Sequence, residues 1–573
     1  MRPVERLLAG LASLTLCLAA LRYGLMPIGD YDYWWQVRTG QEIWQQKSLL
    51  LQEPFSYVAQ GRPWLYKDAG AELLFYFLHH YTGLTGAVLL KATAFVVWVG
   101  ALAFAALRYR KAPWWIVAIL LAFGIEGSAF RVVERPQTLA FAMTALLLLV
   151  LERHRTGRGS LVWCFPLLAL TANLHRAVWL MPPLLVAYGL CRVIDAKLAG
   201  TPWRPALRSE RATLTALLFG CLGALMTPFT VYSLSTSVSM LGSQAYSSRI
   251  PEWQPLTASL LWDASPWALG SVALAVVALL ARGRKQVPWD LALLVLAVAI
   301  GLRSVRFIPY LFLLGALPTC SGLVHLTQRL TSPDTRQRLH LIGATVATLV
   351  AAGTGLLALE SRLPLPRLGL QHHHQPEAAL SFVRQHQFKG RVFNEFQHGG
   401  YLIFHLWPDT RVYVDGRNDW IYTPDELNEA NRALSNPVAL EEARQRYGFD
   451  WLFLANRPED RQRAFIDRSP RWALVFASEA ALVYVDTQGA YAALQSQAYR
   501  VLKPHDLAAS IVHGLQSGQD VAEQTVREAE RMVSEDTESY PANVALAMIY
   551  QMIGHPKAAE QVANVQWLET RLR

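Results

Sequence analysis

Long apolar runs, repeated from the N-terminus to about residue 360, constrain this sequence more than any other feature. A helix needs about 20 apolar residues to cross the hydrocarbon core of a bilayer, and somewhat fewer where neighbouring helices cover it. We therefore predict about eleven spans, and a charged fraction of only 17% agrees with a membrane protein. The predicted spans are 7–27, 84–107, 113–128, 137–151, 161–174, 177–194, 210–227, 264–281, 288–302, 307–325 and 339–358.

Basic residues are concentrated in the short loops that follow the even-numbered spans. Cytoplasmic loops carry the excess of Lys and Arg in membrane proteins, so this pattern places the N-terminus in the cytoplasm. With an odd number of spans, residues 28–83 and everything after residue 360 lie on the outer side. The net charge of +10 reflects these loops, and we attribute it to membrane topology rather than to nucleic-acid binding.

The pattern becomes that of a soluble protein beyond residue 375. Helical segments at 424–434 and 438–447 alternate with short strand-like runs, which predicts an α/β domain over residues 376–490. The predicted strands are RVFNEF, RVYVDGR, WLFLAN, WALVFAS and ALVYVD.

The last segment, residues 505–573, is predicted to be a helical tail. Its stretch NVALAMIYQMIGHPKAAEQV has the spacing of a tetratricopeptide hairpin, although any packed helical hairpin gives the same pattern. Such a tail is a candidate surface for a protein partner. Residues 361–375, which contain His372–His374, are interpreted as a polar linker between a membrane domain, 1–360, and the soluble part, rather than as a metal site.

The stretch GDYDYWWQVRTG, residues 29–40, places Asp30 and Asp32 among four aromatic residues directly after the first span. Residues 33–46 can form an amphipathic helix in the membrane interface, where aromatic rings settle at headgroup depth. An aspartate here either caps that helix or acts on a hydroxyl, an amide proton or a divalent cation. Both interpretations stay open for each aspartate.

Further charged residues lie at the outer ends of the spans. Ionisable groups near membrane depth are candidates for function by default, and arginines hold phosphate through forked, charged hydrogen bonds. The structural alternatives are an ion pair for Glu134, a satisfied helix end for His175, and interfacial anchoring for Arg303 and Arg306, which we expect one turn apart on one helix face. The candidates are Arg131, Glu134, Arg135, His175, Arg176, Arg249, Glu252, Arg303 and Arg306.

Together these features resemble the GT-C superfamily of glycosyltransferases, and most closely one bacterial branch of membrane proteins. The resemblance rests on motifs that follow in order through most of residues 29–420: DYDYWWQVRTGQEI, PFSYVAQGRPW, ERPQTLAF, LTANLHRAVWLMP, TPFTVY, IPEWQP, RSVRFIPY and NEFQHGGYLIFHLWPDTRVYVDGRND. It implies a multi-pass α-helical protein of the bacterial inner membrane, with a periplasmic or extracellular C-terminal domain.

By this resemblance the chain is an inverting glycosyltransferase that moves a sugar from a polyprenyl-phosphate donor to a glycan, lipid or protein acceptor on the outer face. Asp30 or Asp32 would be the base that activates the acceptor, and the other would orient it or bind a divalent cation such as Mg or Mn. The phosphate leaving group would be held by Arg131, Arg135, Arg303 and Arg306.

The chain departs from that branch at two places. Lys67 and Asp68 stand where a His/Glu and a Trp usually follow the PW of the first outer loop, and Arg176 replaces a glycine. We expect these departures to change which donor or acceptor is bound, and to have less effect on the fold.

The motif from Asn394 to Arg417 is the sharpest one in the soluble part. Gly399 and Gly400 would allow a tight entry into a helix. Asp415 and Arg417 predict an ion pair, either with each other or between the soluble domain and the membrane domain, and recognition of the acceptor is the functional alternative.

Two other classes of function compete with the transferase. One is a non-catalytic scaffold for envelope polysaccharide assembly, built on a degenerate GT-C core. The other is a lipid or glycan transporter, which the outer-only position of the charged residues disfavours, because alternating access needs polar sites reachable from both sides.

Overall fold

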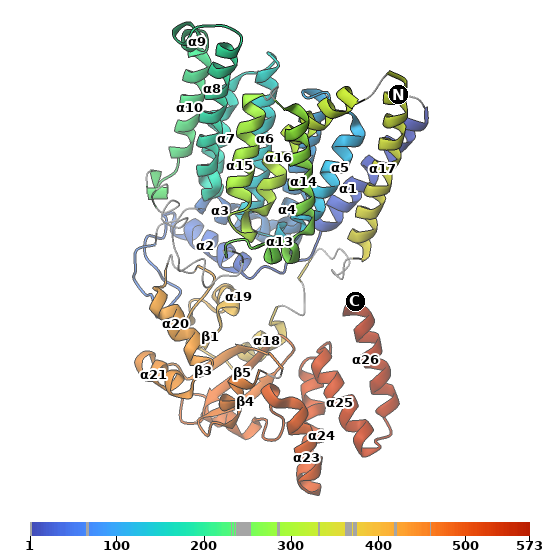
Figure 1. Cartoon of the computed structure of the whole chain (residues 1–573). Coiled ribbons are helices and arrows are strands. Elements are labelled where there is room, and N and C mark those ends of the chain that lie inside the picture. The colour runs from blue at the N-terminus through green and yellow to red at the C-terminus, as the bar shows by residue number, and fades with distance from the viewer. Residues whose placement is uncertain are drawn as a thin grey trace.

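The fold is described from a computed structural model of the whole chain. Its described residues are 3–64, 68–230, 232–233, 235, 252, 254–283, 287–330, 333–360, 369–370, 375–417, 421–458 and 460–572. Figure 1 shows a helical bundle at one end, a soluble α/β domain at the other, and a group of tail helices beside that domain.

The bundle consists of apolar helices at every predicted span. In the described part of the chain, seven of them are long enough to cross a membrane and four are shorter. Proline begins α6, α14 and α15, at a position where a helix leaves the amide unbonded and tolerates its loss. The helices are α1 Pro3–Gly24, α4 Leu84–Arg108, α5 Trp114–Ser128, α6 Pro136–Arg155, α7 Cys164–Leu174, α8 Met181–Leu198, α10 Arg211–Leu222, α14 Pro266–Arg282, α15 Pro288–Gly301, α16 Ile308–Leu330 and α17 Pro333–Glu360.

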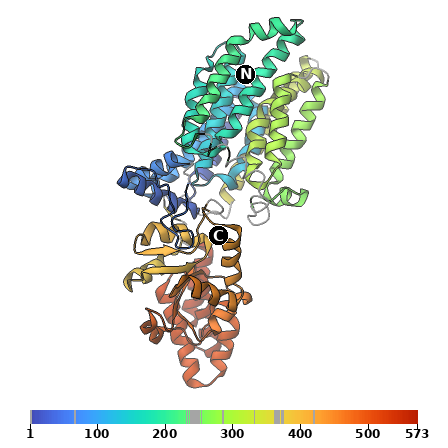
Figure 2. The ribbon, with the colours of Figure 1, turned by 90° about the vertical axis from the view of Figure 1, so that its left-hand side faces the viewer.

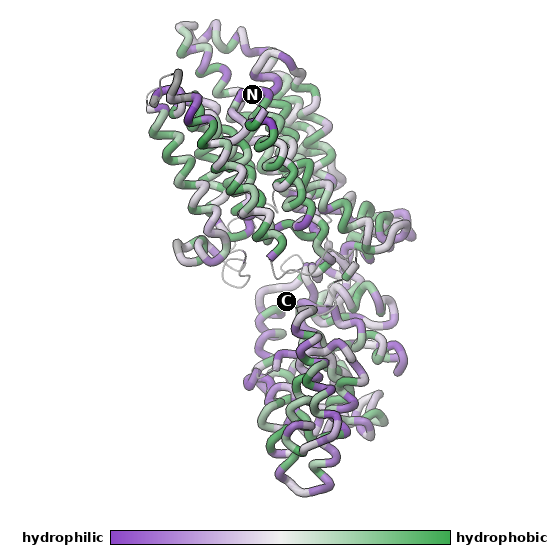
Figure 3. The backbone as a smooth tube through the Cα atoms, turned by 90° about the vertical axis from the view of Figure 1, so that its right-hand side faces the viewer, coloured by the Kyte–Doolittle hydropathy of each residue, from purple (hydrophilic) through white to green (hydrophobic). Residues whose placement is uncertain are grey.

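Apolar residues colour almost the whole bundle in Figure 3, whereas hydrophilic residues alternate with apolar ones in the soluble part. The N-terminus and the short helix α9 (Trp203–Ser209) lie at the end of the bundle that faces away from the soluble domain (Figure 1). We refer to that end as the distal end and to the opposite one as the soluble-domain end.

All five predicted strands form one mixed sheet of order β2-β1-β3-β5-β4. β1 pairs in parallel with β2 and β3, and β5 pairs antiparallel with β3 and β4. The strands are β1 Gly390–Asn394, β2 Thr410–Val412, β3 Trp451–Ala455, β4 Trp472–Ala477 and β5 Ala481–Asp486. The helices beside them are α18 Glu377–Gln385, α19 Phe396–Leu406, α20 Pro424–Ala433, α21 Pro437–Tyr447 and α22 Ala464–Arg468.

The predicted helical tail is confirmed, and its helices pack in sequence order. Gly554 ends α25 in the left-handed conformation, which lets the chain turn into α26 and form a helical hairpin. A tetratricopeptide identity for that hairpin stays a prediction. The tail helices are α23 Leu507–Gln516, α24 Gln519–Glu535, α25 Tyr540–Ile553 and α26 Ala558–Leu572.

The first outer loop joins the two parts of the molecule. It contains α2 (Asp32–Gln46) and α3 (Ala69–Thr82), which lie between the bundle and the soluble domain in Figure 2. Trp35, Phe55 and Trp64 of this loop are buried in the same hydrophobic cluster as the sheet. The loop therefore packs with the soluble domain, although the sequence assigned it to the membrane domain.

Gly399 and Gly400 do not open a helix as predicted, because both lie inside α19. A Cβ on Gly399 would come 2.2 Å from the carbonyl oxygen of Val414, and one on Gly400 would come 2.6 Å from that of Tyr31. Both distances are far below van der Waals contact. The two glycines therefore serve close packing of α19 against the segment that follows β2 and against the start of α2.

A buried ion network lies at the distal end of the bundle. Arg110, in the loop after α4, pairs with Glu152 at 2.5 Å and with Asp290, and its side chain is 2% exposed. Arg282 also pairs with Asp290, at 2.9 Å, and Trp289 donates a hydrogen bond to Glu152 at 2.9 Å. Some of the basic residues that we assigned to cytoplasmic loops are therefore neutralised between the helix ends.

Candidate active site between the bundle and the soluble domain

Asp30 and Asp32 bind the same guanidinium. Arg135, in the loop before α6, places Nε 2.5 Å from Oδ2 of Asp30 and Nη2 3.1 Å from Oδ2 of Asp32. Asp30 also accepts a hydrogen bond from the amide of Asp32 at 2.9 Å, which fixes the bend that turns both carboxylates toward one point. Asp30 thus bonds the first amide of α2, whereas the N-cap residue itself, Tyr31, makes no side-chain cap, and the two carboxylates converge.

Glu252 forms ion pairs with three arginines. Arg306 donates to it at 2.6 Å, Arg131 also forms an ion pair with it, and Arg135 lies 3.5 Å away. Arg131 is held in addition by Gln137 at 2.8 Å. Three arginines and three carboxylates thus form one continuous cluster at the soluble-domain end.

The carboxylates in this cluster differ in acidity. Burial raises the pKa of Asp32 to about 6, while the charge of Arg135 acts in the opposite direction. Burial would also raise the pKa of Glu252, but Arg306, Arg131 and Arg135 outweigh it and bring that pKa to about 2. Of these two carboxylates, Asp32 therefore changes protonation closer to neutral pH. Its side chain is also more exposed than that of Asp30, 16% against 6%.

The other predicted residues of the membrane part take mainly structural positions. Glu134 forms the expected ion pair, with Lys91 of α4, and both side chains are only 2% exposed. His175 accepts a hydrogen bond from the amide of Ala177 at 3.0 Å and so caps the short helix that Arg176 begins. The satisfied helix end is therefore the correct interpretation of His175.

Arg303 and Arg306 do not share a helix face as predicted. The backbone is extended at Ser304, with φ −161° and ψ 166°, so the chain leaves α15 before it enters α16. Arg303 is exposed, whereas Arg306 is buried in the cluster. Of the accessory residues, Asp68 precedes α3 without a side-chain cap, and Lys67 and Arg249 lie outside the described residues.

The soluble domain reaches this site through its Asp-Gly-Arg turn. A Cβ on Gly416 would come 1.8 Å from Oδ1 of Asp32, so the backbone of the turn lies directly against that carboxylate. Oδ1 of Asp32 accepts a hydrogen bond from Nε1 of Trp35 at 3.1 Å, beside the same turn. One wall of the site is therefore supplied by the soluble domain.

Arg417 holds the turn in place. It binds Asp415 at 2.6 Å and also pairs with Glu53 of the first outer loop, and the side chains of all three residues are fully buried. Both predicted ion pairs, within the turn and between the two parts of the molecule, are confirmed. Asn394 supports the turn, since its amide donates to the carbonyl of Val414 at 2.8 Å.

Sequence reasoning missed Lys91, Glu53 and Gly416. Lys91 had a visible signal, because it is a charged residue inside the apolar run of α4, where ionisable groups are rare and usually paired. Glu53 and Gly416 had none, since their partners are hundreds of positions away in the chain.

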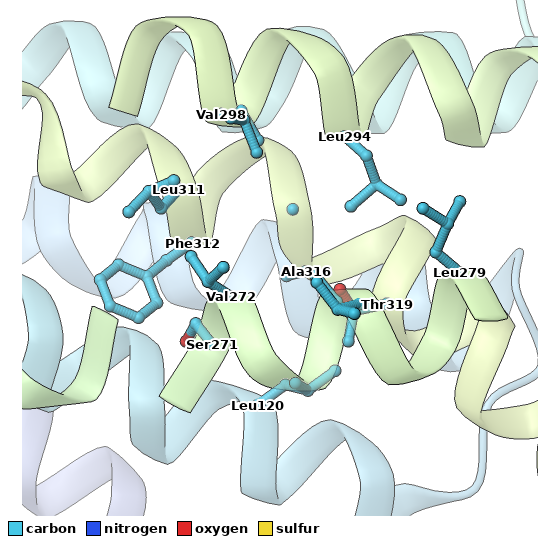
Figure 4. Close-up of a pocket in the computed structure, with 14 residues that line it drawn as sticks. Leu120, Ser271, Val272, Leu279, Leu294, Val298, Leu311, Phe312, Ala316 and Thr319 are labelled. Carbon is cyan, nitrogen blue, oxygen red and sulfur yellow. The ribbon is translucent and has the colours of Figure 1, made fainter. Parts of the chain in front are cut away.

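An apolar crevice lies between α14, α15 and α16, and Leu120 of α5 also lines it (Figure 4). Arg306 comes just before α16, and the crevice begins within two turns of that helix, at Leu311 and Phe312. It continues to Thr319, about 12 Å further along the helix axis at 1.5 Å per residue. Its lining is almost entirely aliphatic, which suits a hydrocarbon chain.

A divalent cation fits the aspartate pair poorly. Among the described residues, no three His, Cys, Asp or Glu side chains lie together in a way that could hold a metal ion. Oδ2 of each aspartate already binds Arg135. Oδ1 of Asp30 accepts from the amide of Asp32, and Oδ1 of Asp32 accepts from Nε1 of Trp35.

The sequence matches no protein-family model and no curated protein sequence. Several solved structures are similar to the structure of this chain. The Archaeoglobus fulgidus oligosaccharyltransferase AglB, in complex with an inhibitory peptide and a dolichol-phosphate, is 11% identical with a TM-score of 0.56 over 94% of this chain and 86% of its own. An A. fulgidus oligosaccharyltransferase tethered with an acceptor peptide is 12% identical, with a TM-score of 0.51 over 83% and 74%.

A third similar structure is the arabinofuranosyltransferase AftD from mycobacteria. It is 16% identical, with a TM-score of 0.51 over 84% of this chain and 41% of its own. At such identities the likeness concerns the fold, and the fold is the one that the sequence motifs led us to expect. The chain therefore has the fold of the GT-C glycosyltransferase superfamily.

Proposed function

We propose that this protein is a membrane glycosyltransferase that moves a sugar from a polyprenyl-phosphate donor to an envelope glycan, lipid or protein acceptor at the soluble-domain end. The observation that carries the proposal is the position of Asp32. This carboxylate binds Arg135 in the arginine cluster and lies against the Gly416 turn of the soluble domain. The apolar crevice begins on α16, the helix that follows Arg306 of the same cluster. Solved structures of the same fold include a complex with dolichol-phosphate, which is a lipid of the required class.

Asp32 is the proposed base. It takes the proton from an acceptor hydroxyl or amide as that group attacks the anomeric carbon, and the bond from that carbon to the phosphate oxygen breaks. A pKa near 6 leaves Asp32 ionised at neutral pH and still able to accept a proton. Asp30, which is tied to the amide of Asp32 and to Arg135, holds this geometry.

Charge balance supports this assignment. The phosphodiester of the donor carries one negative charge, and the lipid phosphate that leaves can carry two. In the same step Asp32 loses its charge by taking a proton, so the total charge of the buried site stays constant. A low-dielectric site favours such a step, because no new net charge has to be buried.

The proposed donor site joins the arginine cluster to the crevice. Arg131 and Arg306 face Glu252, which remains ionised and keeps their guanidinium groups at one place. A phosphate beside them accepts forked hydrogen bonds, while the polyprenyl chain follows the aliphatic crevice along α16. The orientation follows from the distal position of α9 and the N-terminus, since basic loops stay in the cytoplasm.

The test compares envelope glycans from cells that carry wild type, Asp32→Asn or Asp425→Asn in place of the chromosomal copy. Asp425 is an exposed carboxylate in the first turn of α20 and serves as the matched control. Mass spectrometry should show complete loss of one glycan modification with Asp32→Asn and none with the control, at equal amounts of folded protein. Full modification by Asp32→Asn, with loss only on deletion of residues 505–573, would instead support a scaffold.

A further inference from the structure

The cation between the two aspartates is a side chain of this protein. Arg135 offers Nε to Asp30 at 2.5 Å and Nη2 to Asp32 at 3.1 Å, so one planar group satisfies both carboxylates. Its Nη1 points to Glu252, 3.5 Å away. Neighbouring carboxylates in an enzyme site are usually neutralised by a metal ion or by a proton, and here a guanidinium does so.

Arg135 is held at this position from the protein side. Its amide donates to the carbonyl of Val133 at 2.8 Å, and Pro136 begins α6 directly after it. Glu134, the residue before it, is anchored to Lys91, which also donates to the carbonyl of Met26 at the end of the first span at 2.8 Å. The segment that carries Arg135 is thus fastened to both α4 and the start of the aspartate loop.

The charge count argues against an additional cation. Asp30, Asp32 and Glu252 are balanced by Arg131, Arg135 and Arg306. Without bound donor, a divalent ion would add two positive charges to a set that is already neutral, and it would have to displace a forked ion pair first. Although burial disfavours a charge on Arg135, the two aspartates raise its pKa, so it remains a cation.

We propose that Arg135 is the resident cation of this site and takes the place of a divalent metal ion between Asp30 and Asp32. This inference rests on the proposed function, in which the two aspartates form the catalytic site, but it can be tested without measuring sugar transfer. It makes Arg135 a positioning residue that acts through the two aspartates.

The experiment measures Mn²⁺ binding to the purified full-length protein by electron paramagnetic resonance, because free and bound Mn²⁺ give different signals. Wild type should bind no Mn²⁺ that depends on Asp30. Arg135→Ala should gain one Mn²⁺ site, with at least a tenfold increase in affinity, and Arg135→Ala/Asp30→Asn should lose it again. Arg527→Ala, which removes an exposed arginine from α24 of the tail, should behave like wild type.

Two outcomes would overturn the proposal. One is a Mn²⁺ site in wild type that Asp30→Asn removes, because the aspartates would then bind metal with Arg135 present. The other is an Arg135→Ala protein that elutes as a folded monodisperse species and gains no Mn²⁺ site. Neither outcome bears on whether Asp32→Asn abolishes glycan modification, so failure of this proposal and failure of the proposed function are distinguishable.

Discussion

At the scale of single residues, Asp32 sets the expected pH dependence. Burial raises its pKa from the usual value near 4 to about 6, so the base form is lost as the pH falls through 6. We expect the transfer rate to fall about tenfold for each pH unit below 6 and to be constant above 7. A pH series of sugar transfer in detergent solution checks this, and a rate that is unchanged between pH 5 and pH 7 would exclude Asp32 as the base.

Gly416 is the residue at which the soluble domain meets the proposed base. In Gly416→Ala the new methyl group would start 1.8 Å from Oδ1 of Asp32, so the carboxylate has to move. A displacement of about 1 Å in a catalytic group costs roughly 100-fold in rate, and we expect a loss of that order with unchanged expression. Gly100→Ala in α4 is the control, because a Cβ there meets no atom within 4 Å.

At the scale of elements, the ion network at the distal end ties helix ends together. Glu152 of α6 is almost fully buried and bonds to Arg110 and Trp289. Glu152→Leu would leave the Arg110 charge in a nearly dry site with one partner fewer, at a cost of about 3–5 kcal/mol. We expect a clearly lower thermal midpoint in detergent. Glu523→Gln, in the exposed pair with Arg527, should change stability by less than about 0.5 kcal/mol.

Elements were predictable from the sequence because their signals are local. Span length and the run of Val, Phe and Tyr residues identified the bundle helices and all five strands. Contacts between elements that are distant in the sequence were not predictable, because no local pattern indicates which side chains the fold brings together. The resemblance to the GT-C superfamily assigned Arg135 to the phosphate leaving group, and only the fold brings its side chain to Asp30 and Asp32. Periodicity also suggested one helix face for Arg303 and Arg306, which the extended backbone at Ser304 breaks.

At the scale of the whole molecule, the positive-inside rule and the fold together define a testable topology. The short helix α9 and the soluble domain lie at opposite ends (Figure 1). In a Cys17→Ala background, which removes the exposed native thiol, Arg461→Cys in the soluble domain should react with a membrane-impermeant maleimide on intact spheroplasts. Arg204→Cys in α9 should react only after the membrane is opened, and the reverse pattern would invert the proposed orientation.

The contact of Gly416 with Asp32 also determines the order in which the proposed site can be assembled. A chain is made and inserted from its N-terminus, so the aspartates reach the membrane long before the Asp-Gly-Arg turn has been synthesised. The Gly416 turn reaches the aspartates only after the soluble domain has crossed the membrane and folded, and after Arg417 has paired with Glu53. Under the proposed function, a half-made chain would carry both aspartates without the wall that this turn supplies, and it would become active only after the soluble domain had folded against them.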